Sequence, residues 1–472
     1  MGRSHPGGED QGRLDLVASL VERARAAQAR YERYSQAEVD EVVTAAGWAI
    51  VKPENNRRLA EAAVRDTGLG NVADKIAKNE RKTVGLLRDL QGAKSVGVIA
   101  EDPARGIVEI ARPAGVVAAI TPSTNPAATP ANKIINALKG RNAIIVAPSP
   151  KGWSTCELLL QFMHHELEKT KAPRDLVQML PAPVTKESTR ELMREADLVV
   201  ATGSQANVRA AYSSGTPAVG VGLGNVAVIV DDTAELGDAA RKIAESKCFD
   251  NATSCSSENS LVILEKIYAP MLAELKKAGG VLLDAQEKAK LQAALWQGGK
   301  LNPDIMARPV DDLLKLSGLK HQKAKFLMVE ESGAGKDYPF SGEKLSLVLT
   351  LYKAATFDEA FDLVRRIYEY QGAGHSVGIH TKNDAHVMRL GLAMPAARVI
   401  VNQAHAIANG GAWDNGLPFS LSMGCCTWGG NSISDNMNYR HYLNITRIVR
   451  PIAPRVATVE GVFGAYHRKH GK

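Results

Sequence analysis

From residue 107 onward, short runs of β-branched and other apolar residues alternate with stretches that have helical spacing. The expected strands are IVEIAR, GVVAAIT, NAIIVA, LVQML and DLVVA, and the expected helices lie at about 128–139, 152–168 and 186–195. Parallel strands need crossover connections of this length, and the crossover helices cover both faces of the sheet. The sequence therefore predicts an α/β fold with a mostly parallel sheet, which follows a helical segment over residues 13–95.

A second alternation predicts a second α/β lobe after residue 245. Its expected elements are the strands SLVILE, AKFLMVE, LSLVLTLY, HSVGIH and ARVIVN, together with the helix FDEAFDLVRRIYEY. We therefore expect a disordered tail over 1–12, a first lobe over 13–245, a second lobe over 246–440 and a C-terminal segment over 441–472. The last segment contains LNITRIVR, whose alternating pattern predicts a strand that joins a sheet outside its own lobe.

The composition excludes several classes of protein. Of the 472 residues, 45% are hydrophobic and 23% are charged, and no stretch approaches the ~20 apolar residues of a membrane span. The net charge of +7 comes from dispersed Lys and Arg residues, which does not favour nucleic-acid binding. The five cysteines are an odd number without a CxxC pair, so we expect neither a disulfide framework nor a metal site. These features predict a cytoplasmic protein without a membrane or nucleic-acid partner.

The segment CFDNATSCSSENS holds two cysteines with different surroundings. Cys248 ends a predicted helix on an apolar face, where a thiol usually acts as a small buried hydrophobe. Cys255 lies among small hydroxyl residues, which leave room for a substrate and supply hydrogen bonds. A thiolate near backbone N–H groups can have its pKa lowered from about 8.5 toward neutrality. Cys255 is therefore the candidate nucleophile, although this local pattern alone does not decide the matter.

Several longer blocks carry a resemblance to a known family. They are ITPSTNPAATP, LKGRNAIIVAPSPKG, VVATGS, VGVGLGNVAVIVDD, CFDNATSCSSENS, GEKLSLVLTLY, GAGHSVGIH and NGLPFSLSMGCCTWGGNSISDNM. In this order the chain resembles the aldehyde dehydrogenase superfamily, and within it the CoA-acylating branch. The resemblance implies a dinucleotide-binding lobe, a catalytic lobe and a C-terminal oligomerisation strand. It also implies that Cys255 is the nucleophile and that the chain forms a homo-oligomer, either a dimer or a tetramer.

The resemblance assigns further residues to the expected site. Asn125 matches an oxyanion-hole amide, with an Asx-turn as the alternative, and His375 matches a histidine beside the nucleophile, with a hydrogen-bonded core histidine as the alternative. Glu343 matches the carboxylate that holds the nicotinamide ribose, unless it is a surface residue paired with Lys344. The other expected contacts to NAD or NADP are Ser149, Lys151, Gly203, Ser204, Gly222 and Gly224. Gly203 and Ser204 precede a predicted helix whose N-terminus suits a pyrophosphate, although the strict G-x-G-x-x-G pattern is absent and Arg209 stands where many relatives have glycine.

A missing residue indicates the acyl acceptor. Family members that release a free acid use a glutamate in an E-L-G-G segment to activate water, but the corresponding segment here reads AVGVGLGN. No carboxylate occurs between Arg209 and Asp231. A thioester on Cys255 would then wait for a stronger nucleophile, and the thiol of coenzyme A is one. Glu258 could replace the missing base, but we expect it to be structural.

The substrate is less constrained than the chemistry. The chain resembles acylating sulfoacetaldehyde dehydrogenases, so the expected substrate is sulfoacetaldehyde, with acetaldehyde and propionaldehyde as alternatives. Because no alcohol dehydrogenase segment and no amphipathic targeting helix are found, we expect a free-standing enzyme. Candidate cations for a sulfonate are His405, Lys133, Arg440 and His441, each with a surface or core role as the alternative. The loop with Cys425, Cys426 and Trp428 could flank the pantetheine arm or bury thiols without a role. An acid-forming dehydrogenase, an acyl-phosphate reductase and a non-enzymatic cofactor-binding module remain as alternatives.

Overall fold

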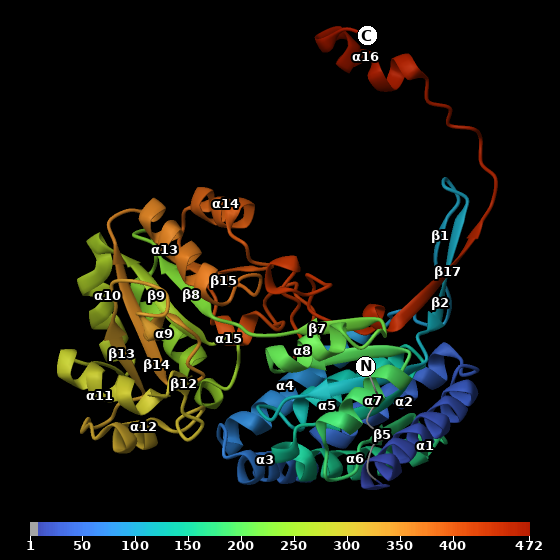
Figure 1. Cartoon of the computed structure of the whole chain (residues 1–472). Helices are drawn as coiled ribbons and strands as arrows, with labels where there is room; N and C mark the ends of the chain where they lie inside the picture. Colours follow the sequence, from blue (N-terminus) through green and yellow to red (C-terminus); the bar gives the residue numbers. More distant parts are fainter. Residues whose placement is uncertain (1–7) are drawn as a thin grey trace.

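The computed structural model describes residues 8–472 and divides them into two lobes and a projecting arm. In Figure 1 the N-terminal lobe and the second lobe lie next to each other, and the arm rises above the N-terminal lobe. Residues 1–7 of the expected tail lie outside the described residues. The first helix begins at Gly8, so the structure places helix within the second half of the expected tail over 1–12.

Four helices open the first lobe, as the sequence predicts. They are α1 (Gly8–Tyr31), α2 (Gln36–Val51), α3 (Pro53–Thr67) and α4 (Val72–Leu90). Local capping determines where they begin: Ser35 and Glu38 form a capping box on α2, and the Asn71 side chain accepts a hydrogen bond from the Asp74 N–H on α4. Pro53 occupies the first turn of α3, where its missing N–H costs no intrahelical bond.

The first lobe is built on a parallel five-stranded sheet with the order β5-β4-β3-β6-β7. Its strands are β3 (Val116–Thr121), β4 (Ala143–Pro148), β5 (Val177–Met179), β6 (Leu198–Thr202) and β7 (Ala218–Val221). The connecting helices are α5 (Ala128–Lys139), α6 (Trp153–Lys169), α7 (Lys186–Glu195) and α8 (Gln205–Tyr212). Every residue of β3 and β4 is buried, as expected for strands covered on both faces. These elements confirm the predicted α/β fold.

The second lobe contains a parallel seven-stranded sheet with the order β10-β13-β14-β9-β8-β15-β16. Its strands are β8 (Val226–Val230), β9 (Glu258–Leu264), β10 (Gly280–Leu282), β13 (Phe326–Glu330), β14 (Val348–Ala354), β15 (Val377–His380) and β16 (Val399–Val401). Its helices are α9 (Leu236–Cys248), α10 (Glu265–Lys277), α11 (Ala285–Leu295), α12 (Val310–Ser317), α13 (Phe357–Tyr370), α14 (Asp384–Ala393) and α15 (His405–Ala408), and β11 (Trp296–Gln297) pairs with β12 (Lys300–Leu301). The interior is a separate apolar core.

The expected boundary between the lobes at 245/246 is wrong. β8 pairs with β9 and β15 of the second sheet, so the chain leaves the first sheet after β7, at residues 222–225. The chain also returns to the first lobe before residue 440, since Phe419 and Met437 are part of the first apolar core. The reason is that apolar residues on both sides of residue 245, and on both sides of residue 440, pack into the same core.

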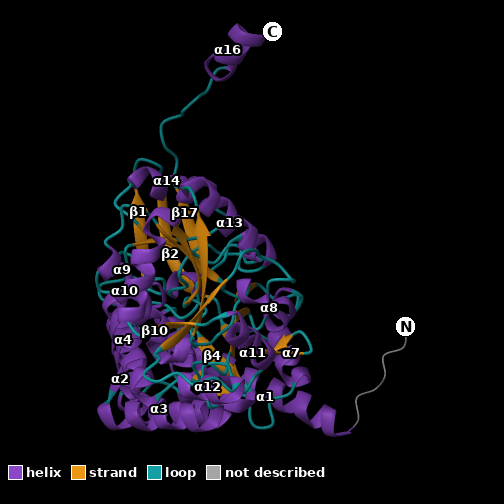
Figure 2. Ribbon diagram, turned by 90° about the vertical axis from the view of Figure 1, so that its left-hand side faces the viewer, coloured by secondary structure: helices purple, strands orange, loops and turns teal. Residues whose placement is uncertain are grey.

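The arm is an antiparallel sheet of β1 (Gly97–Asp102), β2 (Ile107–Pro113) and β17 (Leu443–Val449). The expectation that IVEIAR joins the parallel sheet is therefore wrong. The segment forms the middle strand of this arm. The C-terminal strand β17 pairs with β2 of the same chain, outside the second lobe. Beyond it, α16 (Val459–His470) extends away from both lobes (Figure 2). None of the helices in residues 8–472 has the length and apolar character needed to cross a bilayer.

Candidate functional site

Cys255 lies in the turn that leads from α9 into β9, at the junction of the lobes. Asp250, Asn251 and Ala252 of this turn have positive φ angles of 51°, 52° and 59°. Burial of the thiol, together with the negative charge of Glu343, raises the pKa of Cys255 to about 12. The expected lowering of this pKa is therefore wrong, and the resting side chain is a neutral thiol that needs a base.

His375 supplies a base at hydrogen-bond distance. Its Nε2 lies 3.3 Å from Cys255 Sγ, and its Nδ1 lies 2.8 Å from the hydroxyl of Ser376. Burial and the positive charge of Arg398 lower the pKa of His375 well below its ordinary value, so the ring is neutral near pH 7. A Ser376 hydroxyl that accepts from Nδ1–H leaves Nε2 free to accept the thiol proton. The Ser376 hydroxyl also contacts His405 Nε2, at 2.9 Å.

Arg398 fixes the backbone of His375. This buried guanidinium donates to the carbonyl of His375 at 2.7 Å and to the carbonyl of Gly424 at 2.8 Å. Its other donors bond Asn409, Ser434 and Asn436. Since all five N–H donors have acceptors, Arg398 is a structural anchor and has no free donor for an anionic substrate.

Asn125 lies in the loop after β3, at the carboxyl end of the first sheet. Its Oδ1 accepts a hydrogen bond of 2.9 Å from Lys78 Nζ on α4. The same ammonium donates to Thr253 Oγ1 at 3.1 Å, two residues before Cys255. Among the described residues, none accepts a hydrogen bond from Asn125 Nδ2 or from the backbone N–H of Cys255. The two donors expected for an oxyanion hole are therefore free.

The expected cofactor residues of the first lobe line one edge of its sheet. Ser149 follows β4, and its N–H donates to the carbonyl of Thr121 at 3.1 Å, while Lys151 is exposed in the next turn. Gly203 follows β6 with φ of +144°, and Ser204 is the N-cap of α8. The edge between β3 and β6 is where the strand order reverses, which is the usual ligand crevice of an open parallel sheet. These residues fit a dinucleotide at this edge.

The other expected cofactor residues are two glycines in the loop before β8 and a buried glutamate. Gly222 and Gly224 lie in the loop between β7 and β8, and a Cβ on Gly224 would lie 2.2 Å from the carbonyl oxygen of Cys255. Glu343 is buried, and its Oε1 lacks a hydrogen-bond partner among the described residues. Burial raises the pKa of Glu343 to about 8, against the lowering effect of Lys344 and Lys247. An unpaired buried carboxylate oxygen fits an incoming ribose hydroxyl.

Other polar residues near the turn have structural contacts. Glu258 accepts from Ser246 Oγ at 2.6 Å and from the His405 N–H at 3.3 Å, which agrees with the expected structural role. Cys425 is buried and its Sγ lies 3.6 Å from the carbonyl of Met423, whereas the Cys426 Sγ donates to Ser434 Oγ at 3.2 Å and Trp428 is exposed. Across residues 8–472, no group of His, Cys, Asp or Glu side chains could hold a metal ion.

The four candidate cations for a sulfonate differ in their surroundings. Burial lowers the pKa of His405 to about 3, so it is neutral and cannot serve as a cation. Lys133 is buried with no hydrogen-bond partner for Nζ among the described residues, and burial lowers its pKa to about 7. Arg440 and His441 lie in the segment just before β17, where Arg440 contacts the Tyr439 ring and His441 lies near Asp435. Of the four, Lys133 has a buried amine without a hydrogen-bond partner among the described residues.

The sequence reasoning missed three residues of the site. Lys78 and Arg398 bear charges that usually indicate solvent exposure, and both are buried. Ser376 is a small polar residue adjacent to His375, and nothing in the sequence marked it. The only available signal was the spacing of Lys75, Lys78 and Lys82 on one face of α4, which reads equally well as a solvated helix surface.

Comparisons with known proteins show which family the chain is similar to. The model of the aldehyde dehydrogenase family matches residues 10–289. A sulfoacetaldehyde dehydrogenase (acylating) of Cupriavidus necator is 61% identical over 98% of this chain and 94% of its own length. A sulfoacetaldehyde dehydrogenase (acylating) of Bilophila wadsworthia is 42% identical over 97% of this chain and 100% of its own length. The crystal structure of an acetylating aldehyde dehydrogenase from Geobacillus thermoglucosidasius superimposes with a TM-score of 0.92 at 36% identity, covering 96% of this chain and 100% of that chain.

Proposed function

Because the chain belongs to the aldehyde dehydrogenase family, we propose that it oxidises a short aldehyde to an acyl-CoA with NAD or NADP and coenzyme A. The observation that carries the proposal is the contact of 3.3 Å between Cys255 Sγ and His375 Nε2. It joins a nucleophile to a base at the junction of the two lobes, next to a loop without carboxylates.

The first half of the reaction uses Cys255, His375 and Asn125. His375 Nε2 accepts the thiol proton as Cys255 Sγ attacks the aldehyde carbon, which forms a hemithioacetal. The Asn125 amide and the Cys255 N–H, both free of other acceptors, donate to the developing oxyanion. A bound nicotinamide ring supplies the chemistry that oxidises this adduct to a thioester on Cys255. Losing one such oxyanion donor typically costs about 3 kcal/mol of transition-state stabilisation.

The nicotinamide cofactor fits the crevice at the carboxyl edge of the first sheet. Gly203 and Ser204 would offer the N-terminus of α8 to the pyrophosphate, and Ser149 and Lys151 would contact the adenosine ribose. Glu343 would hold the nicotinamide ribose through its unpaired Oε1, and Gly224 leaves space beside Cys255. An ionised Glu343 would be favoured by such hydrogen bonds.

The second half of the reaction transfers the acyl group to coenzyme A. The absence of any carboxylate between Arg209 and Asp231 removes the base that would activate water. Once His375 has released its first proton to solvent, it takes the proton of the CoA thiol as that thiol attacks the thioester. Cys255 leaves as the thiolate and regains a proton from His375. Glu258 does not replace the missing base because Ser246 and the His405 N–H already occupy its carboxylate.

Sulfoacetaldehyde is the proposed substrate. The support is the 61% identity with a relative that bears that name. Among the four candidate cations we propose Lys133 for the sulfonate, because its buried amine has no hydrogen-bond partner among the described residues and a strong acid needs a counterion. Acetaldehyde and propionaldehyde are the competing substrates.

An assay of NADH or NADPH formation, with and without coenzyme A, tests the proposal. We expect turnover to require CoA, to give an acyl-CoA by mass spectrometry and to be fastest with sulfoacetaldehyde among three aldehydes. Cys255→Ala should abolish turnover, whereas Cys248→Ala, on α9 with its thiol 3.8 Å from the carbonyl of Lys325, should retain it. Release of a free acid at full rate without CoA would contradict the proposal.

We also propose that the chain forms a homo-oligomer and acts in the cytoplasm. Five free cysteines suit a reducing compartment. The arm and α16 expose apolar side chains that a second copy of the chain would cover.

A further inference from the structure

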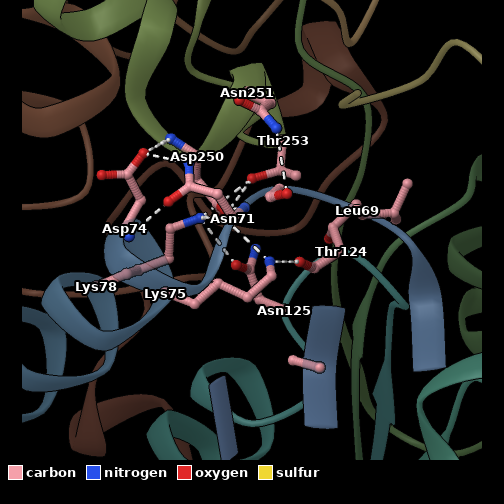
Figure 3. A network of polar contacts seen from close by, with 12 residues as sticks. Leu69, Asn71, Asp74, Lys75, Lys78, Thr124, Asn125, Asp250, Asn251 and Thr253 are labelled. Atoms are coloured by element: carbon pink, nitrogen blue, oxygen red, sulfur yellow. Dashed lines mark hydrogen bonds and ion pairs between the residues drawn. The ribbon is translucent and has the colours of Figure 1, made fainter. Parts of the chain in front are cut away.

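A buried group of charges joins α4 of the first lobe to the turn before Cys255. Asp250 is fully buried and accepts from Lys75 Nζ at 3.1 Å and also from Lys78 Nζ. Its second oxygen accepts from the Asn71 N–H at 3.0 Å. Figure 3 shows Lys75 and Lys78 reaching from α4 toward this carboxylate. The group therefore holds the turn with positive φ angles against the first lobe.

The two lysines differ in what else they contact. Lys78 Nζ donates to Asp250 Oδ2, to Thr253 Oγ1 at 3.1 Å and to Asn125 Oδ1 at 2.9 Å. An ammonium has three N–H donors, so all three are used. Lys75 Nζ donates instead to the backbone carbonyl of Thr124, at 3.1 Å (Figure 3), and among the described residues it makes no hydrogen bond to the Asn125 amide.

The chemistry of an ammonium fixes the orientation of the Asn125 side chain. A lysine can only donate, so the amide must present Oδ1 to Lys78 and cannot flip to present its NH₂ group. Nδ2 is thereby directed away from Lys78, and no described residue accepts its hydrogen bonds. Without Lys78, the amide could present either Oδ1 or its NH₂ group to the substrate, and Oδ1 is an acceptor that cannot stabilise an oxyanion.

The same ammonium also controls the other half of the oxyanion hole. Through Asp250 and Thr253 it holds the segment that leads to the Cys255 N–H. Thr253 Oγ1 in turn donates to Asp250 Oδ2 at 2.7 Å, which closes the network. A single group thus contacts the Asn125 side chain from the first lobe and the cysteine turn from the second.

We propose that Lys78 is a positioning residue that locks the Asn125 amide with its NH₂ group toward the oxyanion and registers it against the Cys255 turn. This inference rests on the proposed function, since it concerns the oxyanion of the Cys255 adduct. Lys78 acts through Asn125 and does not touch the aldehyde. Its loss should therefore lower the rate of the first half-reaction and leave aldehyde and cofactor binding nearly unchanged.

The first test compares Lys78→Met with Lys75→Met in the full chain. Each variant removes one ammonium from Asp250 and leaves the other, so both should lose a similar amount of thermal stability. We expect K78M to lower the single-turnover rate of NADH or NADPH formation about 10- to 100-fold, less than the ~10²–10³-fold cost of deleting a donor outright. K75M should lower it less than about 3-fold. Equal losses in the two variants would overturn the proposal.

The decisive measurement is a double-mutant cycle with Asn125→Ala. If Lys78 acts through the amide, K78M should slow the N125A enzyme by no more than about 2-fold, because there is no longer an amide to orient. A purely structural role for Lys78 would give multiplicative losses, and that result would refute the proposal. If K78M does not fold, the same cycle with Lys78→Arg keeps a charge beside Asp250 but changes the donor geometry.

Alkylation of Cys255 separates this proposal from the proposed function. Iodoacetamide does not generate an oxyanion, so K78M should be alkylated at Cys255 within about 2-fold of the parent rate. If Cys255→Ala or N125A retained full turnover, the proposed function would fail. If both abolished or slowed turnover while K78M did not, the function would stand and only the role of Lys78 would be lost.

Discussion

At the residue scale, the Cys255–His375 pair combines an inactive resting state with a nearby base. Burial raises the pKa of the Cys255 thiol to about 12 and lowers the pKa of His375, so both effects of burial favour the neutral pair over a thiolate–imidazolium pair. A neutral thiol resists oxidation and off-target alkylation. In the proposed reaction, the pair becomes reactive only when Cys255 Sγ attacks the aldehyde carbon and His375 accepts the thiol proton.

This balance predicts the pH dependence of Cys255 alkylation. A raised pKa means that the thiolate fraction keeps increasing as the pH rises toward the value of about 12. In the enzyme without ligands, we therefore expect the iodoacetamide rate at Cys255, followed by mass spectrometry, to increase through pH 10. A small free thiol measured alongside should level off above its pKa of about 8.5. A plateau for Cys255 below pH 8 would indicate a preformed ion pair with His375.

The sequence indicated the proposed reacting residues more readily than the residues that hold them. Cys255, Asn125, Glu343 and His375 each occur in a block shared with the family, and the structure groups Cys255 with His375 at 3.3 Å. Lys78 has no such block, and a lysine on an amphipathic helix is expected in solvent. Its burial depends on Asp250, which is 172 residues away in the sequence. A contact between residues so far apart is a property of the packed lobes and leaves no local pattern.

At the scale of elements, the short loop between β7 and β8 explains both the misplaced boundary and part of the site. Only residues 222–225 separate the two strands, too few for the crossover of about a dozen residues that parallel neighbours need. The chain must therefore change sheets there, and this signal was present in the sequence. IVEIAR carried a similar signal in Glu109 and Arg112, since charges are unusual in a strand buried on both faces.

The close packing of this loop against the cysteine turn predicts the effect of Gly224→Ala. The added Cβ would lie 2.2 Å from the carbonyl oxygen of Cys255, so the loop or the turn must shift. Because a misplacement of about 1 Å can cost ~10²-fold in rate, we expect NADH or NADPH formation to fall by about that factor while the chain remains folded by circular dichroism. Gly391→Ala on α14 is the control, since its Cβ has no neighbour within 4 Å. An active G224A enzyme would show that the loop adapts freely.

At the scale of the whole molecule, the arm lies apart from the proposed site. β17 pairs with β2 over seven residues, and the chain then continues beyond both lobes to α16. Every proposed site residue precedes the arm strand β17, as does Lys78. The alternating pattern of LNITRIVR correctly predicted a strand outside the second lobe, but a sequence pattern does not identify the chain on which the neighbouring strand lies.

The exposed side chains of the C-terminal helix predict that it contributes to the homo-oligomer. Val459 and Val462 lie one turn apart on α16 with 70% and 60% of their surfaces exposed, and Phe463 is 49% exposed. Covering such side chains contributes roughly 25 cal/mol per Å² of apolar surface, so we expect the full chain to sediment as a dimer or tetramer at micromolar concentration. The double substitution V459D and V462D should shift the distribution toward smaller species, and Lys469→Gln on the same helix should not. A full chain that sediments as a monomer would contradict the oligomer, and an unchanged distribution in the Asp variant would place the interface on the strands of the arm instead of on α16.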